Sequence, residues 1–203
     1  SVKLIDSKIN YNQARLGGGL YSIFCKPVID NCIFEYNLAT SGGAISLGTD
    51  GSINILNSTF SYNRAYDMGG VIFQDHSGGS LVENTIFDSN SAKSGAVINS
   101  IGVNAQIQIV NSQANNGYAD AGGVIFWVDV EPDISNLETL HNEAAQGDLF
   151  ATPAIDLIWT HENSDQPFTE QSYEILTKPL EITLRDYYQN QMVLDSTTTF
   201  SIR

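Results

Sequence analysis

An asparagine that stands two residues before an alanine recurs along most of the chain, and this repeat constrains the fold more than any other feature. Successive copies lie 25 to 27 residues apart. A period of this length, with small drift between copies, is typical of a solenoid whose insertions sit in loops. The residues at this position are Asn12, Asn37, Asn63, Asn90, Gly117 and Asn142.

Three further positions repeat in phase with this series. Six residues before it stands a second polar series, made of Asp6, Asn31, Asn57, Asn84, Asn111 and Asn136. Three residues before it stands an apolar series that begins with Ile9, continues with Phe34, Phe60 and Phe87, and fades to Ala114 and Thr139. After the alanine come one to three glycines and then a short apolar run, such as Val71 to Phe73.

These patterns predict short strands joined by tight turns. Asn, Gly, Ser and β-branched residues dominate, whereas helix formers are sparse. Asparagine tolerates the left-handed backbone of a sharp corner, and asparagines stacked at one corner can form a hydrogen-bonded ladder. We therefore expect residues 1–150 to form a right-handed parallel β-helix of about six coils. Both asparagine series would be structural ladders, and Phe34, Phe60 and Phe87 would stack in the core.

The motif pairs resemble a known family. Phe34-Glu35-Tyr36-Asn37 and Gly42-Gly43-Ala44-Ile45 are similar to the FxxN and GGAI repeats of polymorphic outer membrane proteins. Similar repeats occur in large surface proteins of ciliates and other protists, and in pectin-lyase-like β-helices. The resemblance covers roughly residues 1–150 and implies the fold. It leaves function open, because this fold hosts adhesins, autotransporter passengers, polysaccharide lyases and phage tailspikes.

The period is lost after Phe150. Residues 151–170 are expected to form a linker or capping segment, which includes a polar stretch around Pro167. In residues 171–203, apolar and polar residues alternate with period two, as in half-buried strands. The stretch from Pro179 to Asp195 resembles the start of immunoglobulin-like segments that follow β-helix arrays in ciliate surface proteins. We therefore expect the beginning of an immunoglobulin-like β-sandwich there. Because Asp6 already holds a ladder position, the chain is expected to be a segment of a longer protein.

The charge of the chain limits the classes of partner that it can bind. The formal net charge is −14, with only 9 Lys and Arg residues. Phosphate binding needs a basic face, so nucleic acid and anionic membrane surfaces are disfavoured as partners. Acidic polysaccharides are disfavoured too, unless calcium bridges them. The sequence contains no apolar run long enough to suggest a transmembrane helix.

The sequence offers few candidates for chemistry. Asp50, Asp75 and Asp129 follow the apolar runs of coils two, three and five, and with calcium they could supply oxygen ligands on one face. A lyase or hydrolase also needs a base nearby, but no Arg or Lys occurs near equivalent positions, and coil three offers only Arg64 beside its ladder asparagine. His76 follows Asp75 in a glycine-rich loop and is expected to be a surface residue. We therefore expect no enzymatic activity and no resident metal.

Outward-facing residues could make contacts with partners. Tyr11, Tyr36 and Tyr62 share one phase of the repeat, one residue before the ladder asparagine. This stripe could bind sugars or a partner protein, or it could simply pack across the coils.

Two modifications also stay open from the sequence. Cys25 and Cys32 could close a small disulfide loop in an oxidising compartment, or remain free thiols. Asn57-Ser58-Thr59 is an N-glycosylation sequon, but Asn57 is also a ladder position, where we expect it to be buried against its neighbours.

Taken together, these observations favour a non-catalytic structural or adhesive scaffold, a segment of a large extracellular or cell-surface protein or filament. Its partners would be other chains of the assembly or copies of itself. The alternative is a calcium-dependent carbohydrate-binding, or lyase-like, β-helix.

Overall fold

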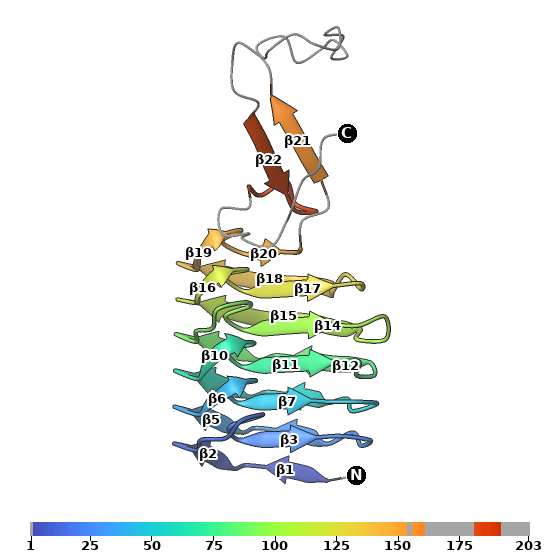
Figure 1. Cartoon of the computed structure of the whole chain (residues 1–203). Helices are drawn as coiled ribbons and strands as arrows, with labels where there is room; N and C mark the ends of the chain where they lie inside the picture. Colours follow the sequence, from blue (N-terminus) through green and yellow to red (C-terminus); the bar gives the residue numbers. More distant parts are fainter. Residues whose placement is uncertain (1, 154–155, 161–180, 192–203) are drawn as a thin grey trace, which may run out of the picture.

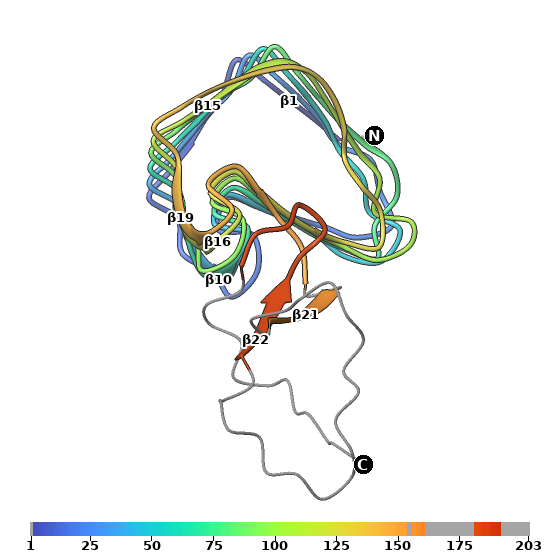
Figure 2. The ribbon, with the colours of Figure 1, turned by 90° about the horizontal axis from the view of Figure 1, so that it is seen from above.

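The chain folds into parallel β-coils stacked as a solenoid of about six turns (Figure 1). The computed structural model describes residues 2–153, 156–160 and 181–191. Every regular element in these ranges is a β-strand. Seen along the axis, successive coils follow nearly the same path (Figure 2). The expected architecture of about six parallel β-coils is therefore confirmed.

The longest wall of the solenoid is one bent parallel sheet, which we call sheet A. Its strands up to coil four lie on either side of a corner, whereas the two strands of coils five and six run through that corner. On the first side of the corner are β1 (Lys3–Ile5), β4 (Val28–Asp30), β8 (Asn54–Leu56) and β12 (Ser80–Glu83). On the second side are β2 (Lys8–Asn10), β5 (Ile33–Glu35), β9 (Thr59–Ser61) and β13 (Ile86–Asp88), and the continuous strands are β15 (Ile107–Asn115) and β18 (Asp133–Leu140).

Two further walls complete each coil. Sheet B consists of two parallel pairs of strands: β6 (Leu38–Ser41) with β10 (Arg64–Met68), and β16 (Tyr118–Ala121) with β19 (Glu143–Gln146). Single β-bridges through Ser91 and Ser94 connect the two pairs. Sheet C contains β3 (Leu20–Ser22), β7 (Ile45–Leu47), β11 (Ile72–Asp75), β14 (Ile98–Ile101), β17 (Ile125–Val128) and β20 (Phe150–Ala151). All pairings in these walls are parallel, so hydrogen bonds join each coil to the next.

Four corners with left-handed backbone give each coil its shape. Within sheet A, the first corner is formed by Asp6, Asn31, Asn57, Asn84, Asn111 and Asn136, all with φ between 46° and 61°. The second, before sheet B, is formed by Tyr11, Tyr36, Tyr62, Ser89, Asn116 and His141. The third, before sheet C, is formed by Gly17, Gly42, Gly69, Gly95, Gly122 and Gly147, and the fourth by Phe24, Asp50, His76, Gly102 and Asp129. Glycine is required at the third corner, because a Cβ on Gly42 would lie 2.1 Å from the carbonyl oxygen of Ile45.

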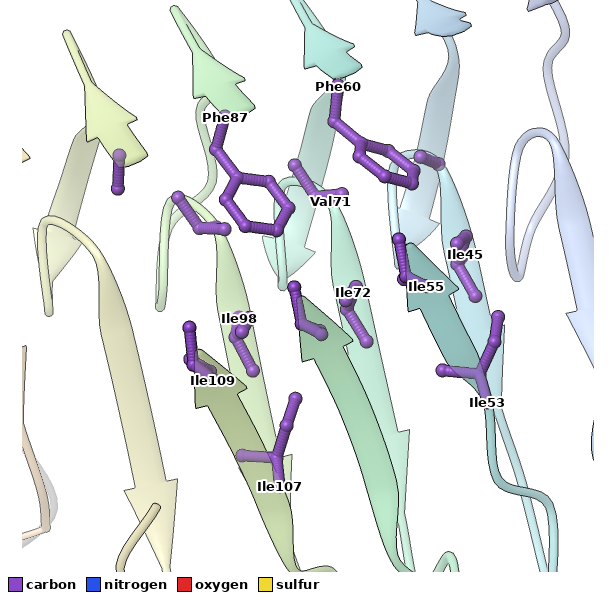
Figure 3. Packing of buried hydrophobic residues seen from close by; sticks show 14 of the residues in the cluster. Ile45, Ile53, Ile55, Phe60, Val71, Ile72, Phe87, Ile98, Ile107 and Ile109 are labelled. Atoms are coloured by element: carbon purple, nitrogen blue, oxygen red, sulfur yellow. The ribbon is translucent and has the colours of Figure 1, made fainter. Parts of the chain in front are cut away.

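The core is a set of apolar columns that run along the axis (Figure 3). Phe34, Phe60 and Phe87 are 0–1% exposed, and their rings stack with centroids 4.9 Å and 5.6 Å apart. Two isoleucine-rich columns face each other across the interior, Ile29, Ile55, Val82 and Ile109 from sheet A and Ile45, Ile72, Ile98 and Ile125 from sheet C. Each coil thus buries its apolar side chains against the coils before and after it.

The segment after the last coil folds back onto it. β21 (Asp156–Thr160) pairs antiparallel with β22 (Glu181–Arg185). Beyond β22, Asp186 is fully buried and its carboxylate accepts hydrogen bonds from Gln146 Nε2 and from the backbone N–H of Thr152, both at 3.2 Å. Part of the region expected to be sandwich-like therefore covers the end of the solenoid. Residues 161–180 and 192–203, on which most of the linker and sandwich predictions fall, lie outside the described residues.

Candidate functional site

The inner asparagines form a ladder along the start of sheet B, and this ladder is buried from Asn37 onward. Asn37 Oδ1 accepts hydrogen bonds from the backbone N–H and Nδ2 of Asn12, and Asn63 does the same for Asn37 at 3.1 Å and 3.0 Å. Asn90 Oδ1 likewise accepts hydrogen bonds from the backbone N–H and Nδ2 of Asn63. The second Nδ2 hydrogen of each amide is donated to a backbone carbonyl in the preceding coil, that of Ile9 for Asn37 and that of Phe34 for Asn63. At Gly117 the side chain is missing, and Asn142 bonds the glycine N–H directly at 2.8 Å.

The outer asparagines at the first corner are exposed instead. Asn31 Nδ2 donates to Asp6 Oδ1, Asn57 Nδ2 donates to Asp30 Oδ1 at 2.9 Å, and Asn136 Nδ2 donates to Asn111 Oδ1. Asn84 Nδ2 lies 3.5 Å from Asn57 Oδ1. The expectation that Asn57 is buried is wrong, because a left-handed corner residue on the outside of the bend points its side chain into solvent. Burial therefore gives no argument against a glycan at the Asn57 sequon.

The three tyrosines form a stacked column at the second corner. The ring centroids of Tyr11 and Tyr36 are 5.0 Å apart, those of Tyr36 and Tyr62 are 4.9 Å apart, and the planes are within 5° of parallel. Partial burial between its neighbours raises the pKa of Tyr36, and the nearby tyrosine hydroxyls and Glu35 add to the effect. Beside the column, Lys8 Nζ and Glu35 Oε2 form an ion pair at 2.7 Å.

This stacking decides how the tyrosine column can be used. Both faces of the Tyr36 ring are covered by other tyrosines, so a sugar ring cannot stack on it. The column exposes ring edges and hydroxyl groups to solvent. Such a surface suits hydrogen bonds to a partner, and the ring faces contribute to cohesion between the coils.

A groove on the outer face of sheet B is a hollow that sequence reasoning missed. Its volume is about 460 Å³. The side chains at its rim are long, whereas its floor is made of Ser91, Ala65 and Ala92. The side chains at the rim of the groove belong to Arg64, Tyr66, Lys93, Tyr118 and Asp120. The guanidinium carbon of Arg64 lies 5.6 Å from the centroid of the Tyr66 ring, which places the cation over the aromatic face.

The three candidate calcium ligands do not come together. Asp50 and Asp129 share the fourth corner, but they belong to coils two and five, which are separated by three coil rises of roughly 4.8 Å each. Asp75 precedes the corner residue His76, and its Oδ1 is 2.5 Å from His76 Nδ1. Within the described ranges, no cluster of three or more His, Cys, Asp or Glu side chains is arranged to hold a metal ion.

The two cysteines are free thiols, so the disulfide alternative does not hold in this structure. Cys25 is exposed near the fourth corner, where its Sγ lies 3.0 Å from Ser22 Oγ. Cys32 is buried in the core after the first corner, and its thiol donates to the carbonyl of Asp30. The straight strand β4 keeps the two side chains at opposite ends of one wall.

Comparison with protein-family models, with curated proteins and with solved structures gave no match. The likeness to polymorphic outer membrane protein repeats thus rests on the quoted motifs, and the fold is described as a parallel β-solenoid. Among the residues described, no helix is long and apolar enough to cross a membrane.

Proposed function

We propose that this chain is a non-catalytic structural and adhesive scaffold, a segment of a large extracellular surface or filament protein. It acts through contacts with other protein chains or with copies of itself. The observation that supports this proposal is the constancy of the coil: four left-handed corners recur at matching places, and core columns run through the stack. Repetition of this kind produces a rigid rod whose outer side chains are free to vary.

The outer surface of the described coils offers several groups for contacts with a partner. The tyrosine column presents hydroxyl groups in a row, and the second side of sheet A exposes Ile33 and Ile86 at 39% and 42%. Paired polar side chains lie between and beside them, such as Gln113 with Glu138. A mixed face of this type fits a protein interface with an apolar centre and a polar surround.

Light scattering on the chain across a concentration series, with calcium and with a chelator, tests this proposal. We expect concentration-dependent association that calcium does not change. A chain that remains monomeric at every concentration and binds no chain of its parent assembly would contradict the scaffold role. Calcium-dependent binding of a glycan, lost on Asp75→Ala or Asp129→Ala, would favour the carbohydrate-binding alternative. Release of cleaved products from a polysaccharide would contradict the absence of catalysis.

A further inference from the structure

The groove on sheet B is built around a residue that interrupts the repeat. From the ladder asparagine to the third-corner glycine, coil three has one residue more than coils two and four. The pairing of β10 with β6 shifts register between Ala65 and Met68. This is a β-bulge, a feature that re-aims side chains and is frequent beside functional sites.

The backbone contacts identify Tyr66 as the extra residue. The carbonyl of Asp67 accepts hydrogen bonds from the N–H groups of Lys93 and Ser94, at 3.0 Å and 2.9 Å. One coil later, the carbonyl of Lys93 accepts in the same way from Asp120 and Ala121. Asp67, Lys93 and Asp120 are thus equivalent, and Tyr66 has no counterpart in these coils. Its side chain is 57% exposed at the rim of the groove.

The groove also collects the positive charge of the central coils. Between residues 27 and 177 the sequence contains only two Lys or Arg residues, Arg64 and Lys93, and both line the groove. The ion pairs found in the described part of the chain involve Lys8 and His76, so neither groove cation is paired with a carboxylate there. Both cations are therefore available as hydrogen-bond donors to a ligand.

The remaining lining supplies an aromatic surface, acceptors and room. Tyr118 is 60% exposed. Single β-bridges pair Arg64 with Ser91 and Ser91 with Tyr118, so these three residues stand in one column along the axis. Because the side chain of Ser91 is small, the column has a depression between Arg64 and Tyr118. Tyr66 and Tyr118 belong to coils three and five, two coil rises or roughly 10 Å apart along the axis. The hollow of about 460 Å³ lies within the range of small-molecule sites.

We propose that this groove binds a neutral oligosaccharide, with about two sugar rings lying between Tyr66 and Tyr118. The Tyr118 ring, and the face of the Tyr66 ring that Arg64 does not cover, would contact the apolar C–H faces of the sugars. Arg64 and Lys93 would donate to hydroxyl oxygens, and Asp120 and Ser91 would accept from hydroxyl groups. A polyanionic glycan is disfavoured by the net charge of −14 and by Asp120 itself. This site needs no calcium and goes beyond the scaffold role proposed above.

Titration calorimetry in the presence of a chelator tests the proposal. The probes are defined di- to tetrasaccharides of β-1,4-linked glucose, β-1,4-linked N-acetylglucosamine and α-linked mannose, with an oligouronate of matched length for comparison. We expect at least one neutral oligosaccharide to bind and the oligouronate to bind at least tenfold more weakly. If no neutral probe binds, or if the oligouronate binds best, the proposal is wrong.

Variants then localise the binding. Deletion of Tyr66 restores the regular coil length, so the fold should be retained while binding is lost. Tyr118→Ala should weaken binding at least tenfold, and Ser91→Trp should abolish it by filling the floor. Tyr21→Ala removes a tyrosine of 49% exposure on sheet C and should change nothing. Far-ultraviolet circular dichroism and thermal unfolding establish that each variant is folded. Binding that survives in folded groove variants would overturn the assignment, whatever the outcome of the scattering experiment.

Discussion

Asn63 Oδ1 accepts two hydrogen bonds from Asn37, one from its backbone N–H at 3.1 Å and one from its Nδ2 at 3.0 Å. Asn63 Nδ2 donates in turn to Phe34 O and to Asn90 Oδ1. One side chain in coil three thus satisfies polar groups in coils two and four. Because it is fully buried, none of these groups can turn to water when it is removed.

Asn63→Ala is therefore expected to destabilise the chain by about 3 kcal/mol, since it leaves at least two buried polar groups without partners. Chemical denaturation followed by circular dichroism measures this change. Asn57→Gly is the matched control, because Asn57 is exposed and glycine keeps the left-handed backbone. Its effect should stay within about 0.5 kcal/mol. Equal losses in the two variants would show that burial of the inner ladder is unimportant.

Tyr36→Ala is expected to lower the unfolding temperature by a few degrees, because Tyr36 stacks on two neighbouring rings. Tyr36→Phe keeps both ring contacts and should leave the temperature nearly unchanged. Differential scanning calorimetry of both variants makes the comparison. If alanine is tolerated as well as phenylalanine, the column contributes no cohesion and its tyrosines must be explained by a ligand or partner.

Tyr188 makes the stability of the chain pH-dependent in alkaline solution. Burial, with Glu131 nearby, raises the pKa of Tyr188, although the hydrogen bond from Trp127 Nε1 acts against this. The folded chain therefore keeps this proton when the unfolded chain, with a pKa of about 10, has lost it. The contribution of Tyr188 to the free energy of unfolding is complete below about pH 10, and it is lost as the pH rises through the pKa of Tyr188 in the folded chain.

Tyr188→Phe should consequently reduce the fall in stability above about pH 10. Denaturation midpoints of the parent and the variant over a pH series test this expectation, with Tyr187→Phe as the control. Tyr187 is the adjacent tyrosine and is 50% exposed. An identical alkaline slope in the parent and Tyr188→Phe would contradict the assignment.

Asp186→Ala should release the segment that covers the last coil. The Asp186 carboxylate is buried and accepts from Gln146, from Thr152, and from both the backbone N–H and Nδ2 of Asn190. Hydrogen exchange should then rise at residues 150–152 and 186–190 and stay unchanged in coils one to three. Asp129→Ala, an exposed aspartate at the fourth corner, should change neither region. If hydrogen exchange at residues 150–152 and 186–190 is the same in Asp186→Ala as in the parent chain, other contacts hold the segment.

The sequence predicted the features that recur with the period. Phe34, Phe60 and Phe87 share one phase, and the structure stacks them in the core. The repeat could not distinguish the two asparagine series, because period alone does not tell which side of the backbone faces the interior. Asn63 is buried, whereas Asn57 is exposed. Tyrosine is also an unusual residue at a left-handed corner, so the conformation of Tyr36 follows from its place in the coil rather than from its own preference.

Features that break the period were harder to predict. The extra residue before Gly69 was visible in the sequence, but its effect on Tyr66 depends on which carbonyl pairs with Lys93. Arg64, Lys93, Tyr118 and Asp120 come from three coils and form no motif. Trp127 and Tyr188 are 61 residues apart in the chain, and no repeat signals their contact.

The parallel ladders also determine how the molecule would yield to tension. Hydrogen bonds between coils run along the axis, and each coil is held only by its immediate neighbours. A chain pulled from one end would come away one coil at a time. Each step frees 25 to 27 residues, or roughly 90 Å of extended chain, before the next coil bears the force. The solenoid would thus behave as an extensible tether that dissipates work in equal increments.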